Sequence, residues 1–173
     1  MTDPLGVLNR VKSRNGVAGK IKEIFLNGHT TEENLRFNDK NIRLEFIRVL
    51  RNLGEEWDAT MEAVADEGKL NALKSMKKYL TISNRIVNMI ENSQKSYIGF
   101  FNGKEVDIRE LSIALSYDID LAKDFDAFTY QVTDFIGKID RNYFIDADKD
   151  SANIVRKLEL IEQKFKDREK FFA

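Results

Sequence analysis

Apolar residues recur along much of this chain at spacings of three, four and seven, which is the period of a helix that buries one side. The longest such run extends from Glu105 to Asp140, and a helix of that length would be roughly 50 Å long at about 1.5 Å per residue. Its apolar stripe comprises Ile108, Leu111, Leu115, Ala122, Phe125, Val132, Ile136 and Ile139. A helix of this length favours an elongated bundle over a compact globule.

Two further long helices are expected before it. Thr30 and Glu33 have the spacing of a capping box at the start of the second predicted helix of the chain. We expect this helix to end at the turn before Gly68, and one continuous helix through Gly68 is the weaker alternative. The third predicted helix runs from about Lys69 to Phe100 and is apolar on more than one side, which implies several packing neighbours or a second copy of the protein. The Asn-Gly pair after Phe100 also fits a short hairpin, but a two-stranded ribbon alone is only marginally stable.

The N-terminal part predicts a shorter and irregular helix. Gly16 and Gly19 each cost about 1 kcal/mol relative to alanine in a helix, so we expect an interruption there or a flexible arm over residues 1–19. The stretch Gly16–Lys20 shares features with the P-loop and with the GXXG loop of KH domains, both of which bind phosphate groups. Its glycines are too close for a P-loop, and a KH domain needs strands that the pattern does not predict. We therefore interpret the stretch as a local helix break.

The last helix begins near Asp148 or Asp150, and short connections between all these segments favour antiparallel neighbours. The sequence thus predicts an all-α fold in one domain over residues 1–173: a single elongated up-and-down antiparallel bundle of four long helices plus a shorter, irregular N-terminal helix. The charge distribution is compatible with an up-and-down order, in which consecutive helices are neighbours. The basic segment 67–104 is followed by the acidic segment 105–140, so these neighbours could form favourable charge pairs. Exposed charge pairs contribute little each, so the support is weak.

Composition narrows the functional classes. Apolar residues make up 42% of the 173 residues and charged residues 33%, which suits long helices with one solvated face. The absence of cysteine excludes disulfides, thiolate chemistry and Cys-ligated zinc, and it fits a cytoplasmic protein. A net charge of −1 argues against general affinity for nucleic acid or anionic lipid. No apolar run approaches the roughly 18 residues of a membrane span, so we expect no membrane association.

The segment from Asp146 to Asp150 has the Asp-x-Asp-x-Asp pattern that opens a calcium-binding EF-hand loop. Ser151 and Lys157 stand where that loop needs glycine and a bidentate glutamate, so we interpret the segment as an acidic N-terminal cap of the last helix. His29 is the only histidine and is expected in an exposed turn, because histidine-based metal sites and catalysis need further partners. We predict no metal site and no cofactor.

Asp118 is unusual because it lies on the apolar stripe of the longest helix, between Leu115 and Ala122. A buried carboxylate is costly unless it is paired, so we expect a basic partner or a polar cavity beside it. The candidate partners lie in the third predicted helix: Lys77, Lys78 and Arg85. Neighbouring carboxylates that could form a pair for acid–base catalysis are Asp120, Asp124 and Asp126. No histidine, cysteine or phosphate-binding loop accompanies them, so we assign no catalytic residue.

These observations favour a non-enzymatic interaction, adaptor or regulatory protein that acts on a protein partner through its helix faces, with a homodimer as one form of that association. Two alternatives stay open. A nucleic-acid-associated protein would use basic residues of the first and third predicted helices: Arg10, Lys12, Arg14, Lys20, Lys22, Lys69, Lys74, Lys77, Lys78 and Arg85. A sensory bundle would hold a small ligand between helices near Asp118 and Trp57.

Overall fold

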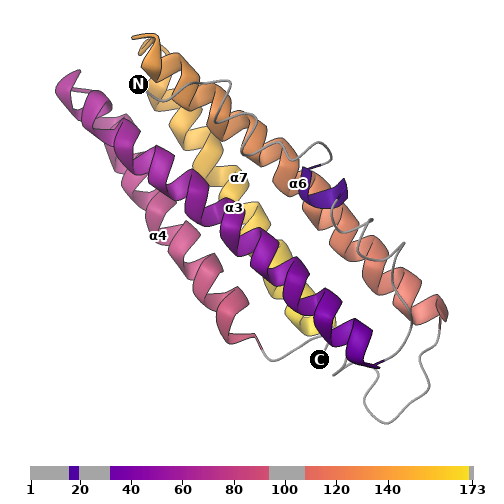
Figure 1. The fold of residues 1–173 in the computed structure, drawn as a ribbon. Coiled ribbons are helices and arrows are strands. Elements are labelled where there is room, and N and C mark those ends of the chain that lie inside the picture. Colours follow the sequence, from indigo (N-terminus) through magenta and orange to yellow (C-terminus); the bar gives the residue numbers. More distant parts are fainter. Residues whose placement is uncertain (1–15, 20–31, 94–107, 172–173) are drawn as a thin grey trace.

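Four long helices run alongside one another in an elongated bundle (Figure 1). The structure, a computed structural model, describes residues 16–19, 32–93 and 108–171. Within them the long helices are α3 (Glu32–Asp66), α4 (Leu70–Asn92), α6 (Ile108–Asp140) and α7 (Ala147–Phe171). Residues 16–19 form a separate helical turn, and the described residues contain no strand. The predicted all-α bundle of four long helices is confirmed.

The helices alternate in direction, so that α3 and α6 run one way along the bundle and α4 and α7 the other (Figure 1). Three neighbouring pairs pack closely: α4 against α7, α3 against α4, and α6 against α7. The fourth pair, α3 and α6, packs less extensively. No helix in the described part of the chain is both long and apolar enough to cross a membrane.

The turn between α3 and α4 lies where the sequence predicts it. Gly68 has φ +73°, and its N–H donates to the carbonyl of Ala65 at 3.0 Å, while Lys69 N–H donates to Val64 at 3.2 Å. Glycine adopts this left-handed conformation without steric cost and commonly ends helices in this way. The alternative of one continuous helix through Gly68 is therefore wrong.

Helix α4 ends at Asn92, whereas the predicted third helix continues to about Phe100; residues 94–100 lie outside the described residues. Ser93 is extended, with φ −67° and ψ 123°. Its carbonyl accepts a hydrogen bond from Arg43 Nη1, and its hydroxyl is bonded to the Glu169 carboxylate. The Ser93 N–H still donates to the Ile90 carbonyl at 3.4 Å, but its carbonyl and hydroxyl make tertiary hydrogen bonds, which the apolar period of the sequence cannot reveal. The alternative hairpin around the Asn-Gly pair lies outside the described residues.

Aromatic side chains from all four helices fill the core. Phe46 of α3 meets Phe125 of α6 and Phe165 of α7 edge to face, with ring centroids 5.3 and 5.0 Å apart. Farther along α3, Trp57 stacks on Tyr79 at 4.2 Å. Burial raises the pKa of the Tyr79 hydroxyl well above its usual value, because the phenolate would lose its hydration. These contacts connect the four helices into one hydrophobic core.

Candidate functional site

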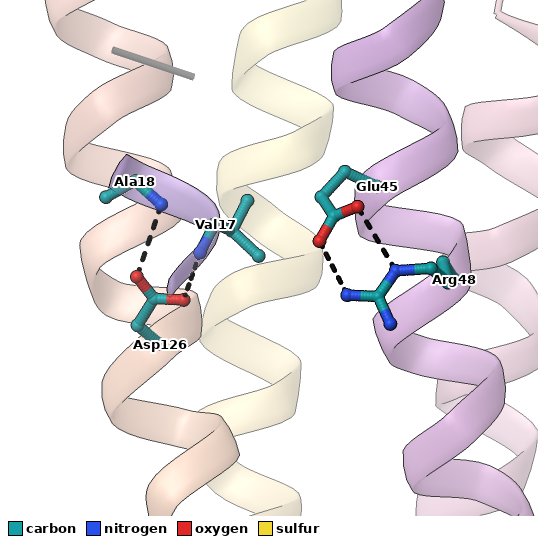
Figure 2. Close-up of polar contacts among 5 residues, drawn as sticks. All are labelled: Val17, Ala18, Glu45, Arg48 and Asp126. Carbon is teal, nitrogen blue, oxygen red and sulfur yellow. Dashed lines mark hydrogen bonds and ion pairs between the residues drawn. The ribbon is translucent and has the colours of Figure 1, made fainter. Parts of the chain in front are cut away.

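The turn at residues 16–19 is held against α6 by a carboxylate. The N–H of Val17 donates to Asp126 Oδ1 at 2.9 Å and that of Ala18 to Oδ2 at 3.2 Å (Figure 2). The side chains of Val17 and Ala18 are only 3% and 8% exposed and belong to the hydrophobic core of the bundle. A segment from outside the four long helices therefore completes the core beside Asp126.

Glycine is strongly favoured at the start of this turn. Gly16 has φ +59°, so a regular right-handed helix cannot continue through it, and the interruption that the sequence predicts is confirmed at this residue. A Cβ atom at Gly16 would lie 2.5 Å from Asp126 Oδ2, which is too close. The backbone N–H groups after Gly16 do bind an anionic group, as the two phosphate-binding patterns would, but that anion is a side chain of the same protein.

Opposing effects act on the half-buried carboxyl group of Asp126. Burial raises its pKa, the hydrogen bonds from Val17 and Ala18 lower it, and the charge of Glu45 raises it; the pKa lies above its usual value on balance. Glu45 lies on α3 and is bonded through both carboxylate oxygens to Arg48, at 2.7 and 3.1 Å (Figure 2). Both helices thus contribute charged groups around the docked turn. We name the region against which the turn docks, defined by Glu45 of α3 and Asp126 of α6, the α3–α6 interface.

A matched pair of glycine substitutions tests whether the turn is docked as described. Gly16→Ala is expected to lower the free energy of unfolding by about 1–3 kcal/mol, because it combines left-handed strain with a clash against Asp126. It should also speed amide hydrogen exchange at Val17 and Ala18. Gly54→Ala is the control, since nothing lies within 4 Å of its added Cβ. Because Gly54 is in a helix, this substitution should leave the free energy of unfolding unchanged or raise it by up to about 1 kcal/mol. Equal effects of the two substitutions would contradict the docked geometry.

Asp118 is fully buried, as the sequence predicts, but its partner is not in the predicted helix. Arg168 of α7 donates from Nε to Asp118 Oδ1 at 2.7 Å and from Nη2 to Oδ2 at 3.2 Å. Both residues lie in the core, with exposed fractions of 0% and 5%. The forked geometry of a guanidinium on a carboxylate compensates much of the desolvation of both charges. The prediction of a partner on α4 is wrong, because the cation that reaches Asp118 comes from α7.

The basic residues of α4 instead pair with α7. Arg85 donates to both oxygens of Glu162, at 3.1 and 2.9 Å, and Lys78 Nζ lies 2.7 Å from Glu159 Oε1. The third candidate, Lys77, is exposed. Arg85 and Lys78 pair with α7 instead of with Asp118 of α6 because α4 packs most extensively against α7.

Arg85 also holds the pKa of Glu162 below its usual value, which predicts a dependence of stability on acid. A glutamate with a lowered folded-state pKa stabilises the fold above its unfolded pKa and loses that contribution as pH falls through the folded value. Between neutral pH and the region below about pH 4.5, unfolding of the Glu162→Gln variant should therefore depend less on pH than that of the wild type. Denaturant titrations at several pH values measure this difference. A variant with the same acid profile as the wild type would show that the pair contributes nothing.

The other acidic residues of α6 do not converge on a catalytic pair. Asp124 pairs with Lys164 of α7, Asp126 holds the docked turn, and Asp120 is exposed. Trp57 and Asp118 also lie apart. Trp57 contacts Phe135, which follows Asp118 by 17 residues on α6, or about 25 Å along the helix axis. They cannot line one small-ligand site together.

The acidic stretch at the start of α7 makes three separate contacts. Asp146 accepts a hydrogen bond from the Tyr143 hydroxyl at 3.2 Å, and Asp150 pairs with Lys138 at 3.0 Å. Asp148 Oδ1 accepts the N–H of Ala72 at 2.9 Å and so caps the N-terminus of the neighbouring helix α4. Asp148 and Asp150 both lie in the first turn of α7, as an acidic cap requires. Among the residues that the structure describes, no cluster of three or more potential ligands could hold a metal ion.

His29 and the basic residues of the first predicted helix lie outside the described residues. Two features of the structure were not predicted from the sequence, namely the docking of residues 16–19 on Asp126 and a cavity between α6 and α7. The two glycines near Val17 were the available signal for the first. No signal marks the second, because its residues come from two helices and only their packing brings them together. No protein-family model, curated protein or solved structure matches this chain.

Proposed function

We propose that this protein is a non-enzymatic interaction or regulatory protein, and that its α3–α6 interface binds a short helical segment of chain. The docked turn carries this proposal: a segment separate from the four long helices lies against α6 with Val17 and Ala18 buried. Direct packing between α3 and α6 is the weakest of the four neighbouring pairs, so this is where an additional segment can contribute to the core.

The contacts define what such a segment must offer. Two successive backbone N–H groups point at a half-buried carboxylate, and a glycine with positive φ permits the close approach. Small apolar side chains follow it. A partner segment therefore needs a glycine followed by two small apolar residues at the start of a helical turn. Specificity would come from Asp126, because burial leaves its charge dependent on those N–H donors.

The resident turn competes with any partner. It is tethered to α3 through residues 20–31, and a tethered segment acts at an effective concentration on the order of 1 mM. A partner that supplies the same contacts in trans must overcome this advantage. The resident turn therefore acts as a built-in competitor at the α3–α6 interface, which suits a regulatory role.

A peptide added in trans tests the proposal. A fluorescently labelled peptide spanning residues 12–22 is titrated with the full-length Gly16→Val variant, whose own turn cannot dock, and binding is followed by anisotropy. We expect saturable binding to this variant and binding weaker by at least about tenfold to the wild type. The control is the same peptide carrying Gly16→Val, which should not bind. Adding Asp126→Ala to the protein should abolish binding of the unaltered peptide, with circular dichroism checking that the bundle is still folded. Failure of the unaltered peptide to bind the folded Gly16→Val variant would refute the proposal.

The further expectations about partners remain predictions. The homodimer is checked by the sedimentation mass at several protein concentrations. For the nucleic-acid alternative, Lys78 and Arg85 of α4 are in ion pairs with α7, while Lys74 and Lys77 are exposed. Binding to random DNA at low salt and at physiological salt would test it directly.

A further inference from the structure

A cavity of about 370 Å³ opens at the surface between α6 and α7. Its apolar part includes Phe135 and Ile154, which are 2% and 3% exposed and belong to the core. Tyr130 also lines the cavity and is 62% exposed, so much of its ring is available for contact. The volume lies within the range of about 300–1,000 Å³ that is typical of small-molecule sites.

The charged residues of the cavity are separated along its length. Lys138 of α6 lies 3.0 Å from Asp150 and 3.5 Å from Asp134, so this end holds two carboxylates and one ammonium group. Arg156 and Lys157 lie farther along α7. Lys157 follows Asp150 by seven residues, or about 10 Å along the helix. One end of the cavity therefore carries net negative charge and the other net positive charge.

Aromatic and amide side chains also line the cavity. Because α6 and α7 are antiparallel and Lys138 meets Asp150, Tyr130 is placed near the level of Lys157. Gln131 and Asn153 also line the cavity, and the Asn153 side chain accepts a hydrogen bond from Arg156 at 3.0 Å. An aromatic ring, hydrogen-bonding amides and separated charges in one cavity are the features that orient a small polar aromatic ligand.

We propose that this cavity binds a small aromatic amine that carries one acidic group. The ring of the ligand packs against Tyr130 and over the apolar floor. Its acidic group lies at the Arg156 and Lys157 end, and its amine donates toward Asp134 and Asp150. This site is separate from the α3–α6 interface and does not depend on the function proposed there.

Trp57 provides an internal reporter of the site. It is the only tryptophan in the chain, and its ring lies 5.0 Å from that of Phe135, which lines the cavity. A ligand packed on Phe135 would therefore alter the surroundings of Trp57 through one aromatic contact. This places the sequence-based candidate Trp57 behind the cavity rather than in it.

The experiment is a titration of the full-length protein with adenosine monophosphate and with 4-aminobenzoate, two aromatic amines with an acidic group. Isothermal titration calorimetry measures binding. A change in Trp57 fluorescence, excited at the red edge of the tryptophan absorption band, indicates that the probe binds near Phe135. We expect saturable binding by at least one probe at concentrations up to about 1 mM. Adenosine lacks the acidic group and ribose 5-phosphate lacks the aromatic amine, so each should bind at least about fivefold more weakly than adenosine monophosphate if that probe binds. Aniline lacks the acidic group of 4-aminobenzoate and benzoate lacks its amine, so each should bind at least about fivefold more weakly than 4-aminobenzoate if that probe binds.

Matched variants decide whether binding occurs in this cavity. Tyr130→Ala should weaken binding of the active probe about tenfold and Lys157→Glu about fivefold. Lys149→Glu makes the same charge change at an exposed position of α7 outside the cavity, and Leu160→Ala removes an exposed apolar side chain; both should bind as the wild type does. The proposal is overturned if neither probe binds, or if binding is insensitive to both Tyr130→Ala and Lys157→Glu.

Discussion

Replacing Asp118 with leucine is expected to lower the free energy of unfolding by about 3–5 kcal/mol. The substitution removes the carboxylate to which the Arg168 guanidinium donates at 2.7 and 3.2 Å. The Arg168 side chain is only 6% exposed, so its charge cannot regain full hydration without moving the end of α7. Urea denaturation of the variant and the wild type measures the difference.

Two controls separate the charge effect from a loss of shape. Asp118→Asn keeps the size of the side chain and one acceptor oxygen, so its effect should be clearly smaller. The double variant Asp118→Leu with Arg168→Leu removes both charges and should recover most of the lost stability, because well-packed apolar residues often replace a buried ion pair without loss. If Asp118→Leu alone leaves stability unchanged, the pair does not hold α6 to α7 as the structure indicates.

Replacing Trp57 with alanine is expected to lower the free energy of unfolding by a similar amount, about 3–5 kcal/mol, for a different reason. Trp57 is fully buried and stacks on Tyr79 at 4.2 Å and against Phe135 at 5.0 Å. Its removal leaves a cavity among three helices that the surrounding rings cannot fill. Chemical denaturation followed by circular dichroism measures the loss, since the variant has no tryptophan fluorescence.

Trp57→Phe is the control for the aromatic contact. It keeps most of the ring packing but removes the Nε1–H that donates to the Met76 carbonyl at 3.0 Å. The expected cost is about 1–2 kcal/mol, the sum of a lost hydrogen bond and a smaller ring. A Trp57→Ala variant no less stable than Trp57→Phe would contradict the packing described at this position.

Much of the fold could be predicted from local features of the sequence. The spacing of apolar residues gave each long helix, because a helix that buries one side must repeat with a period near 3.6. Gly68 marked the end of α3, because the left-handed conformation of that turn strongly favours glycine. The end of α4 was missed, because the bonds of Ser93 to Arg43 and Glu169 join residues distant in sequence.

The candidate sites show the same division. Burial of Asp118 followed from its place on an apolar stripe, but its partner did not, since several helices offered cations and the sequence does not order them in space. The glycines before and after Val17 indicated an interruption but not its use, because Asp126 lies more than 100 residues away. The charged cavity between α6 and α7 left no local signal at all.

The sequence by itself determined which segments are helical and which side of each helix is buried, because both depend on interactions within about one or two turns of chain. Only the tertiary structure decided which helices are neighbours and which charges meet. That choice depends on the complementarity of whole helix faces: α4 packs most closely against α7, and Arg168 rather than an α4 residue reaches Asp118. The docking of Val17 and Ala18 on Asp126 is likewise a tertiary contact, because it joins residues more than 100 positions apart in the sequence.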